Sequence, residues 1–389
     1  MSLSPYHPGF AVVGLVLVAA AAWAAGRTVP FYRKELRVED ATRLTPLDGL
    51  RGVLCFGVMF HHAAAWHVRL RGGEWESPTT LYEMLGLVSV GLFFCVTGFL
   101  FWSRALATSG PIQAGPFLRA RLLRVGPMYL ISVLLIVAII ARHVHWTSAR
   151  TVMELGRMLA LGAASWRSLG GVEAWQVNAG VAWSLQHEWG FYFALPVLAL
   201  GAHASRVWHL LLAIVATYLF IGAGPDMNFL IGIAAAYVAR RADWHPRLRS
   251  RSASVVVLLL LIALAMVPLS AVSRAALPVT AVTFIVIAAG NTMFGLLTFS
   301  GLRLMGLISY SVYLLHAIAI FVMRPLLTRY LGDTPADIGR YWLAVEAGAF
   351  GILFVSMITF RWIELPFIRY EKRTRHALRT APIVKAAVE

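Results

Sequence analysis

The sequence predicts an all-α integral membrane protein with about eleven transmembrane helices. Of its 389 residues, 59% are hydrophobic and only 13% are charged, and the mean hydropathy is +0.72. Soluble domains carry about 25% charged residues, so this composition favours a chain that lies largely within a lipid bilayer. Segments of about 20 apolar residues, the length that crosses the hydrocarbon core, recur along the whole chain.

Eleven apolar segments are candidates for membrane spans. One of them is short, and its ends are poorly fixed by the pattern. The segments centre on residues 9–26, 47–67, 83–104, 121–142, 183–201, 206–222, 226–240 (the short one), 253–271, 277–297, 304–324 and 341–362.

Basic residues gather in alternate connections between these segments. Under the positive-inside rule such connections are cytoplasmic, so eleven spans place the N-terminus outside and the C-terminus in the cytoplasm of a plasma-membrane protein. We expect a basic cytoplasmic tail over 369–389. The basic residues before the tail are Arg27, Arg33, Lys34, Arg37, Arg43, Arg104, Arg119, Arg206, Arg240, Arg241, Arg247, Arg249, Arg251 and Arg303.

Composition also bears on partners and metals. The net charge of +16 could indicate nucleic acid, but the arginines lie scattered between apolar spans, which is typical of topology signals. We therefore expect a bilayer and no nucleic acid as partner. Both cysteines, Cys55 and Cys95, fall in apolar spans, so neither a disulfide framework nor a metal site is expected.

Arg51 and His62 lie inside one apolar segment, LDGLRGVLCFGVMFHHAAAW, at residues 47–66. Eleven positions at about 100° each bring both side chains to nearly the same helix face, about 16 Å apart along the axis. Ionisable groups inside a bilayer usually face a protein interior or a wet cavity. We therefore predict that both face one continuous cavity; the alternative is a histidine that only bonds a neighbouring helix. His61 points about 100° away from His62 and is expected not to share its role.

A second cluster of cations opens the segment at 121–142. Arg121 and Arg124 are three positions apart and therefore neighbours on one helix face, with Arg119 close by. Guanidinium groups bind phosphate through two parallel hydrogen bonds, so the cluster fits a phosphate-rich molecule such as coenzyme A. The alternative is a positive-inside anchor.

Two further helices carry polar stripes. Ser184, Glu188 and Tyr192 recur every four residues, and an acid inside a span must be protonated or find a cationic partner; a structural ion pair is the alternative for Glu188. On the later helix, Tyr313 and His316 follow Ser309 at i+4 and i+7, either as part of a site or as polar contacts between helices.

Other features have structural interpretations. Gly91 and Gly98 are expected to allow close helix packing. Glu364 could pair with Arg361 at the interface. Apolar residues at helical spacing over Thr151–Trp166, within the long connection at 143–182, predict an interfacial or re-entrant helix.

Taken together, these motifs resemble the acyltransferase-3 family of integral membrane acyltransferases. The resemblance rests on LDGLRG with Arg51 and then His62, GLFFxxxGFL at 91–100, RLLR followed by Pro127 and Tyr129, WSLxxE followed by FY at 183–192, and SYSxYLLH at 309–316. It covers about residues 44–368. Thr97 departs from the pattern, since the family usually has Ser before GFL. The family core has ten spans, so the segment at 9–26 would be an addition. The resemblance therefore implies an additional N-terminal helix with a cytoplasmic linker over 1–43 and a membrane acyltransferase core over 44–368.

The resemblance implies transfer of an acetyl or short acyl group from cytoplasmic acyl-CoA to a hydroxyl of a sugar-containing acceptor, either a glycan or a macrolide-type natural product. His62 would be the general base in a ternary complex without a metal, and Glu188 would orient it or bind the acceptor. Arg51 would contact the pantetheine or thioester region of acyl-CoA and could stabilise charge on the thioester oxygen. The remaining expected contacts are Arg119, Arg121 and Arg124 to CoA, and Trp183, Ser184, Tyr192, Tyr313 and His316 to the acceptor.

A transporter or flippase is the alternative function. Intramembrane His, Glu and Arg residues can form a proton or substrate relay. A pair of Gly/Pro-broken helices in corresponding halves of the chain would favour such a transporter. The sequence shows no such pair.

Overall fold

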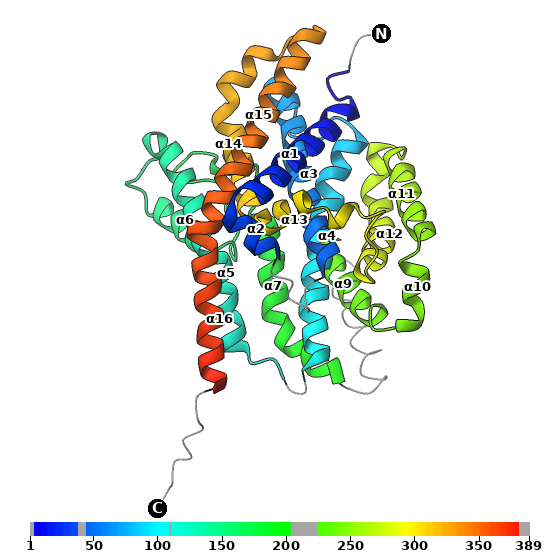
Figure 1. Cartoon of the computed structure of the whole chain (residues 1–389). Coiled ribbons are helices and arrows are strands. Elements are labelled where there is room, and N and C mark those ends of the chain that lie inside the picture. Colours follow the sequence, from blue (N-terminus) through cyan, green and yellow to red (C-terminus); the bar gives the residue numbers. More distant parts are fainter. Residues whose placement is uncertain (1–3, 38–43, 109–110, 204–223, 381–389) are drawn as a thin grey trace, which may run out of the picture.

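The computed structural model describes residues 4–37, 44–108, 111–203 and 224–380, and within these ranges the chain forms helices and no strand (Figure 1). The predicted all-α class is confirmed. The helices are α1 (Pro8–Thr28), α2 (Pro30–Arg37), α3 (Thr45–Leu70), α4 (Thr80–Ala107), α5 (Ala114–Ile140), α6 (Ala149–Leu159), α7 (Trp183–Leu198), α9 (Met227–Val238), α10 (His245–Leu248), α11 (Arg251–Ala265), α12 (Leu269–Ala288), α13 (Ser300–Leu307), α14 (Ser309–Leu327), α15 (Pro335–Thr359) and α16 (Leu365–Thr380).

The predicted number of eleven spans is not confirmed. Six helices in the described ranges are long and apolar enough to cross a membrane, or seven if the bent pair Ala242–Leu248 and Arg251–Ala265 forms one span. The segments expected at 183–201 and 226–240 become α7 and α9, which have only 16 and 12 residues. The expected span at 206–222 lies outside the described residues.

Helix ends differ from the predicted segments because hydropathy alone does not locate caps. The segment expected at 277–297 is helical from Leu269 to Ala288: Pro268 precedes its first residue, and Gly290 follows with a left-handed φ of 102°. The segment expected at 304–324 is divided at Ile308 into α13 and α14.

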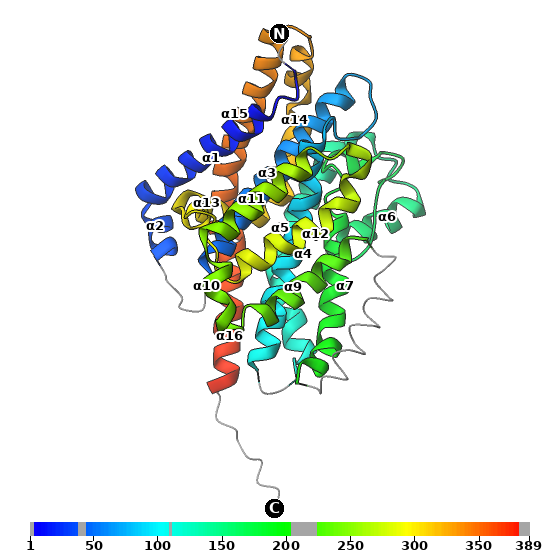
Figure 2. The same cartoon turned by 90° about the vertical axis from the view of Figure 1, so that its right-hand side faces the viewer.

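The helix α3 lies at the centre of the bundle, packed against α4, α13 and α14, while α4 also packs against α9 and α12. Figures 1 and 2 show α14 and α15 extending at one end of the bundle and α16 at the other, with α1 crossing over α13. Every residue of α3 from Leu54 to Phe60 is buried.

Close backbone approaches hold this centre together. A Cβ atom on Gly98 of α4 would collide with the backbone carbonyl of Phe229 on α9, and one on Gly306 of α13 would collide with the carbonyl of Asp48 on α3. Gly91 lies against the Asn228 side chain, which a Cβ would approach to 3.0 Å. The predicted packing role of Gly91 and Gly98 is confirmed, because glycine lets two helices approach this closely.

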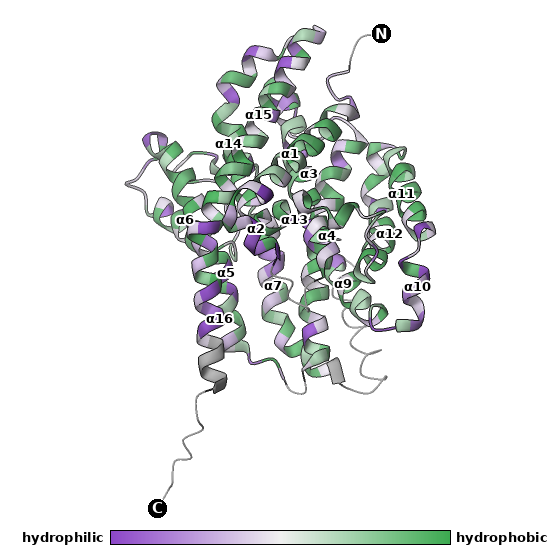
Figure 3. Ribbon diagram, viewed as in Figure 1, coloured by the Kyte–Doolittle hydropathy of each residue, from purple (hydrophilic) through white to green (hydrophobic). Residues whose placement is uncertain are grey.

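The outward faces of the peripheral helices are apolar, as a lipid environment requires. Figure 3 shows hydrophobic colouring over α11 and most of α15, whereas hydrophilic residues concentrate on α16. The exposed large apolar side chains include Val12, Val13, Val16 and Leu17 on α1, Val255, Val256, Leu258, Leu259 and Ile262 on α11, and Leu343, Phe354, Val355 and Ile358 on α15.

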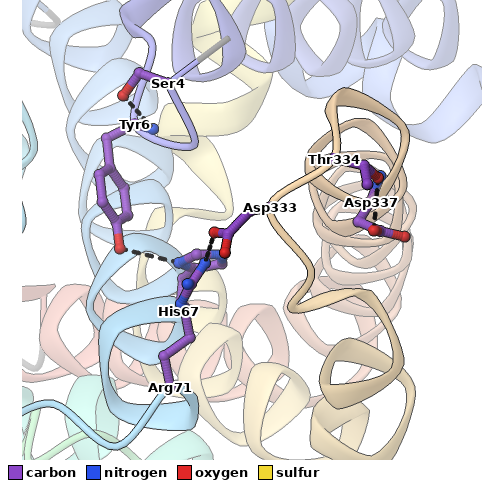
Figure 4. A network of polar contacts seen from close by, with 7 residues as sticks. All are labelled: Ser4, Tyr6, His67, Arg71, Asp333, Thr334 and Asp337. Carbon is purple, nitrogen blue, oxygen red and sulfur yellow. Dashed lines mark hydrogen bonds and ion pairs between the residues drawn. The ribbon is translucent and has the colours of Figure 1, made fainter. Parts of the chain in front are cut away.

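The N-terminal segment is docked onto the end of the bundle where α3 ends and α15 begins (Figure 4). The Tyr6 hydroxyl lies 3.0 Å from Nδ1 of His67 on α3. On α15, Nε1 of Trp342 donates to the carbonyl of Pro5 at 2.7 Å, and Phe10 stacks on the Trp342 ring at a centroid distance of 5.3 Å. These contacts fix the start of α1 to two helices of the bundle.

The connection at 143–182 contains the helix expected there, but α6 ends at Leu159, because the chain turns through left-handed φ values at Leu161 and Gly162. Glu154 of α6 holds this connection together. Its carboxylate accepts hydrogen bonds from the Ser168 hydroxyl and the Gly170 amide, both at 2.8 Å. These bonds, the Ser168 hydroxyl foremost, hold the pKa of Glu154 below its ordinary value.

Replacing Gly98 should weaken the bundle. Gly98→Ala forces α4 away from the Phe229 carbonyl, and overpacking of this kind costs about 1–3 kcal/mol. Gly351→Ala is the matched control, since a Cβ there meets nothing within 4 Å. Thermal unfolding in detergent should show a lower melting temperature for Gly98→Ala and no loss for Gly351→Ala. Equal melting temperatures for the two variants would contradict the close approach.

Candidate active site

Three neighbouring cavities lie between the helices. We call the first the arginine cavity, of about 190 Å³, because Arg51, Arg121 and Arg124 line it. The tail cavity, of about 400 Å³, shares Arg51 and Arg124 with it and extends to Lys372 on α16. The histidine cavity, of about 650 Å³, is lined by His61 and His62. The candidate site is this series of spaces.

Two of the three guanidinium groups in the arginine cavity have no carboxylate in ion-pair contact among the described residues. These are Arg51 and Arg121. The Arg121 guanidinium lies 4.8 Å from the centre of the Phe101 ring, and its buried Nε atom has no hydrogen-bond partner. A cavity that holds unpaired guanidinium groups is suited to an anionic ligand.

Arg124 differs from its neighbours because it is paired. Its Nη1 lies 2.6 Å from Oε2 of Glu364, whose side chain is fully buried. The other carboxylate oxygen of Glu364 accepts a hydrogen bond from Ser311. The expected pairing of Glu364 with Arg361 is therefore wrong: the Arg361 guanidinium instead stacks over Phe31, at 4.8 Å.

The polar stripe of α7 lines the arginine cavity, as do the first two residues of the stripe of α14, but His316 does not. Ser184, Glu188 and Tyr192 of α7 line it together, as do Ser309 and Tyr313 of α14. The Glu188 carboxylate accepts a hydrogen bond from the Tyr192 hydroxyl at 2.9 Å and one from Thr97 at 3.5 Å.

His62, which lines the histidine cavity, is hydrogen-bonded edge to edge to the buried imidazole of His316. Nδ1 of His62 lies 2.8 Å from Nε2 of His316, and the two rings are within 9° of parallel. His62 is almost fully buried and His316 is completely buried. Nδ1 of His316 lies 3.0 Å from the backbone carbonyl oxygen of Val312, one turn earlier on α14.

These contacts locate the protons of the neutral pair. A carbonyl oxygen only accepts, so Nδ1 of His316 carries the hydrogen and its Nε2 is an acceptor. Nδ1 of His62 must then donate to that Nε2 atom. The free lone pair of His62 is left on Nε2, which makes no hydrogen bond to a described residue. His62 is thus held in the tautomer that can accept a proton from a ligand.

Arg51 and His62 do not line the same cavity, so the expectation of one continuous cavity is not met. The arginine and histidine cavities adjoin at a wall formed by Val90 and Tyr313, which line both. The Tyr313 hydroxyl lies 2.8 Å from the Ser184 hydroxyl and 3.2 Å from the Val181 carbonyl. These bonds hold the phenol ring between the two spaces.

A family model described as an acyltransferase domain matches residues 45–361, which is most of the chain. The chain belongs to the acyltransferase-3 family. None of the curated proteins and none of the solved structures compared with the chain matches it. With the apolar helices described above, the family makes the protein a membrane acyltransferase.

Several residues that were predicted to form the site lie elsewhere in the structure of the acyltransferase. Glu188 was expected to orient His62, to stabilise its imidazolium or to bind the acceptor. The described contacts give His62 the partner His316, while Glu188 lies in the arginine cavity. His316 is completely buried behind His62 and lines none of the three cavities. Arg119 is exposed and also lines none of them. Trp183, expected at the acceptor, lines the histidine cavity.

His61 and Thr97 line the cavities of the candidate site, although sequence reasoning gave them no role. His61 was expected to point away from His62, yet both line the histidine cavity. The 100° between adjacent positions describes Cβ directions, and the length of an imidazole side chain can offset it. The position of Thr97 before the GFL motif was a signal for its place beside Glu188.

Breaking the Arg124–Glu364 pair should destabilise the acyltransferase. Glu364→Leu leaves Arg124 without its partner, and hydrogen bonds to charged groups contribute about 1.5–3 kcal/mol. Asp333→Asn is the control, because the Arg71–Asp333 pair is exposed to solvent and such pairs contribute little. Thermal unfolding should show a clear loss for Glu364→Leu and none for Asp333→Asn. An unchanged melting temperature in Glu364→Leu would contradict the buried pair.

Proposed function

We propose that this acyltransferase moves an acetyl or short acyl group from acyl-CoA to a hydroxyl of a sugar-containing acceptor, such as a glycan or a macrolide-type natural product. One observation carries the proposal. His62 offers a free imidazole nitrogen in a cavity that adjoins another cavity with two unpaired guanidinium groups.

The arginine cavity is the proposed donor site. Arg51 and Arg121 have no competing carboxylate in ion-pair contact among the described residues, and guanidinium groups bind phosphate oxygens through paired hydrogen bonds. Lys372 of the tail cavity adds a cation beside the same route. We propose that CoA phosphates lie along these cations, with the pantetheine arm directed toward Tyr313. Arg119 is not part of this proposal, since it lies outside the cavities.

The histidine cavity is the proposed acceptor site. Nε2 of His62 removes the proton of an acceptor hydroxyl, and the oxygen attacks the thioester carbonyl carbon. The carbon–sulfur bond breaks, and the CoA thiolate takes the proton back from His62, so the reaction leaves no net charge. His316 holds the imidazolium through the bond at Nδ1. The transfer is direct, in a ternary complex.

The wall between the cavities sets a requirement for this reaction. The thioester has to meet the acceptor at Val90 and Tyr313, so the phenol ring must turn aside when both substrates are bound. Arg51 lies on the donor side of this wall, where it can stabilise negative charge on the thioester oxygen.

The proposed orientation follows from the charges. If the basic connections and the tail are cytoplasmic, the tail cavity opens toward the cytoplasm of a plasma-membrane enzyme, where acyl-CoA is available. In this orientation residues 44–368 form the acyltransferase core and residues 1–43 an added helix with its linker.

His62→Ala should abolish acyl transfer while leaving acyl-CoA binding intact. General-base catalysis contributes about 10²–10⁴-fold, and the donor cavity does not include His62. Purified protein incubated with radiolabelled acetyl-CoA and candidate acceptors should form labelled ester only with an intact His62, and the exposed His143→Ala variant should match the wild type. Full activity of His62→Ala would remove this residue from the mechanism.

Uptake of acceptor into vesicles without ester formation would favour a transporter.

Arg121→Ala should weaken acyl-CoA binding about tenfold or more, because hydrogen bonds to charged groups contribute about 1.5–3 kcal/mol. Arg119→Ala is the matched control, since it removes an exposed cation of the same helix. Titration calorimetry with acetyl-CoA measures both variants. Equal affinities in the two variants would indicate that Arg121 is only a topology anchor.

A further inference from the structure

The two adjacent histidines of α3 face the same space. His61 and His62 both line the histidine cavity, with ring centroids 4.9 Å apart and planes tilted by 57°. The proposed reaction uses only His62. The role of the second imidazole is therefore open, and its hydrogen bonds indicate what it can do.

His61 is fixed in one tautomer by the protein. Its Nδ1 atom lies 2.9 Å from the backbone carbonyl oxygen of Tyr82 and 3.0 Å from the Ser77 hydroxyl. Because a carbonyl oxygen only accepts, Nδ1 carries the hydrogen, and the lone pair of the neutral ring is on Nε2. The ring also packs flat against Gly86 of α4, where a Cβ atom would lie 2.8 Å from it.

The same reasoning placed the lone pair of His62 on Nε2. Both Nε2 atoms are thus acceptors, both belong to rings that line one cavity, and neither bonds a described residue. Neither Nε2 atom is among the fully enclosed polar atoms, so both are open to hydrogen bonds from a ligand in the cavity. A ligand that satisfies both must offer two donors close to each other, each within about 2.8 Å of its nitrogen.

We propose that the acceptor presents a vicinal diol to this pair of histidines. One hydroxyl loses its proton to His62, and the neighbouring hydroxyl donates a hydrogen bond to Nε2 of His61. His61 is then a positioning residue that selects which hydroxyl is acylated. This inference rests on the proposed function and narrows its acceptor to compounds with adjacent hydroxyls, as on a sugar ring.

The surroundings of the two histidines fit such a compound. The cavity volume of about 650 Å³ lies in the range that takes ligands of drug size. Trp183, which is 43% exposed, offers an apolar ring face, and Glu83 and Asn228 add further polar groups to the wall. A sugar carries both the apolar ring surface and the hydroxyl groups that these residues would contact.

The test uses radiolabelled acetyl-CoA with octyl β-glucoside and its monodeoxy analogues as probes. The acylated hydroxyl of the parent glycoside is first located by NMR. Removing the adjacent hydroxyl should lower kcat/KM about tenfold, the value of one hydrogen bond. Removing a hydroxyl that is not adjacent should have little effect, which makes that analogue the matched control.

Two variants then test His61 itself. In His61→Asn the amide can still donate to the Tyr82 carbonyl, but no acceptor remains at the Nε2 position. The tenfold preference in kcat/KM for the parent glycoside over the analogue without the adjacent hydroxyl should therefore fall to about one. Gly86→Ala pushes the ring out of its slot and should reduce the preference in the same way. Retained binding of labelled acetyl-CoA shows that each variant is folded.

The outcomes separate the two proposals. Ester formation with a tenfold preference that persists in His61→Asn, or with no preference in the wild type, would overturn the diol inference and leave the proposed function standing. No ester on any of these glycosides, or on candidate glycans and macrolides, would overturn the proposed function together with the inference.

Discussion

Each polar side chain that enters an apolar bundle must find a partner or face a cavity, because lipid offers no hydrogen bonds. The central helix α3 meets this constraint repeatedly. Arg51 faces a cavity, His62 bonds His316, and His67 bonds Tyr6. The partners come from α14 and from the N-terminal segment, so the polar residues of one helix determine which elements pack around it.

The cations of the site divide into two kinds under the same constraint. Arg124 has a complete set of partners: Glu364 bonds it, Ser311 bonds Glu364, and Thr359 donates to Ser311 at 2.8 Å. This network joins α5 and α14 to the junction between α15 and α16, from Thr359 to Glu364, and is structural. Arg51 and Arg121 have no such network among the described residues, which is costly unless a ligand supplies the missing charge.

The sequence predicted those features that depend on local spacing. The helical class, the packing role of Gly98 and the shared face of Ser184, Glu188 and Tyr192 follow from periodicity, and the structure contains them. Partner choice could not be predicted, since His62 and His316 are 254 positions apart, and Arg124 and Glu364 are 240 apart. Helix ends at Pro268 and Gly290 depend on caps that hydropathy does not register.

The position of the Tyr313 phenol ring bears on how much acyl donor would be lost to hydrolysis. In the mechanism proposed above, a thioester in the arginine cavity is separated from the imidazole by this ring, so His62 cannot activate a water molecule against the thioester carbonyl while the ring stays in place. In that mechanism a single side chain would limit hydrolysis, the wasteful side reaction of any enzyme that carries an activated ester. The hydrogen bonds of its hydroxyl to Ser184 and Val181 would determine how often the ring turns aside and joins the two cavities.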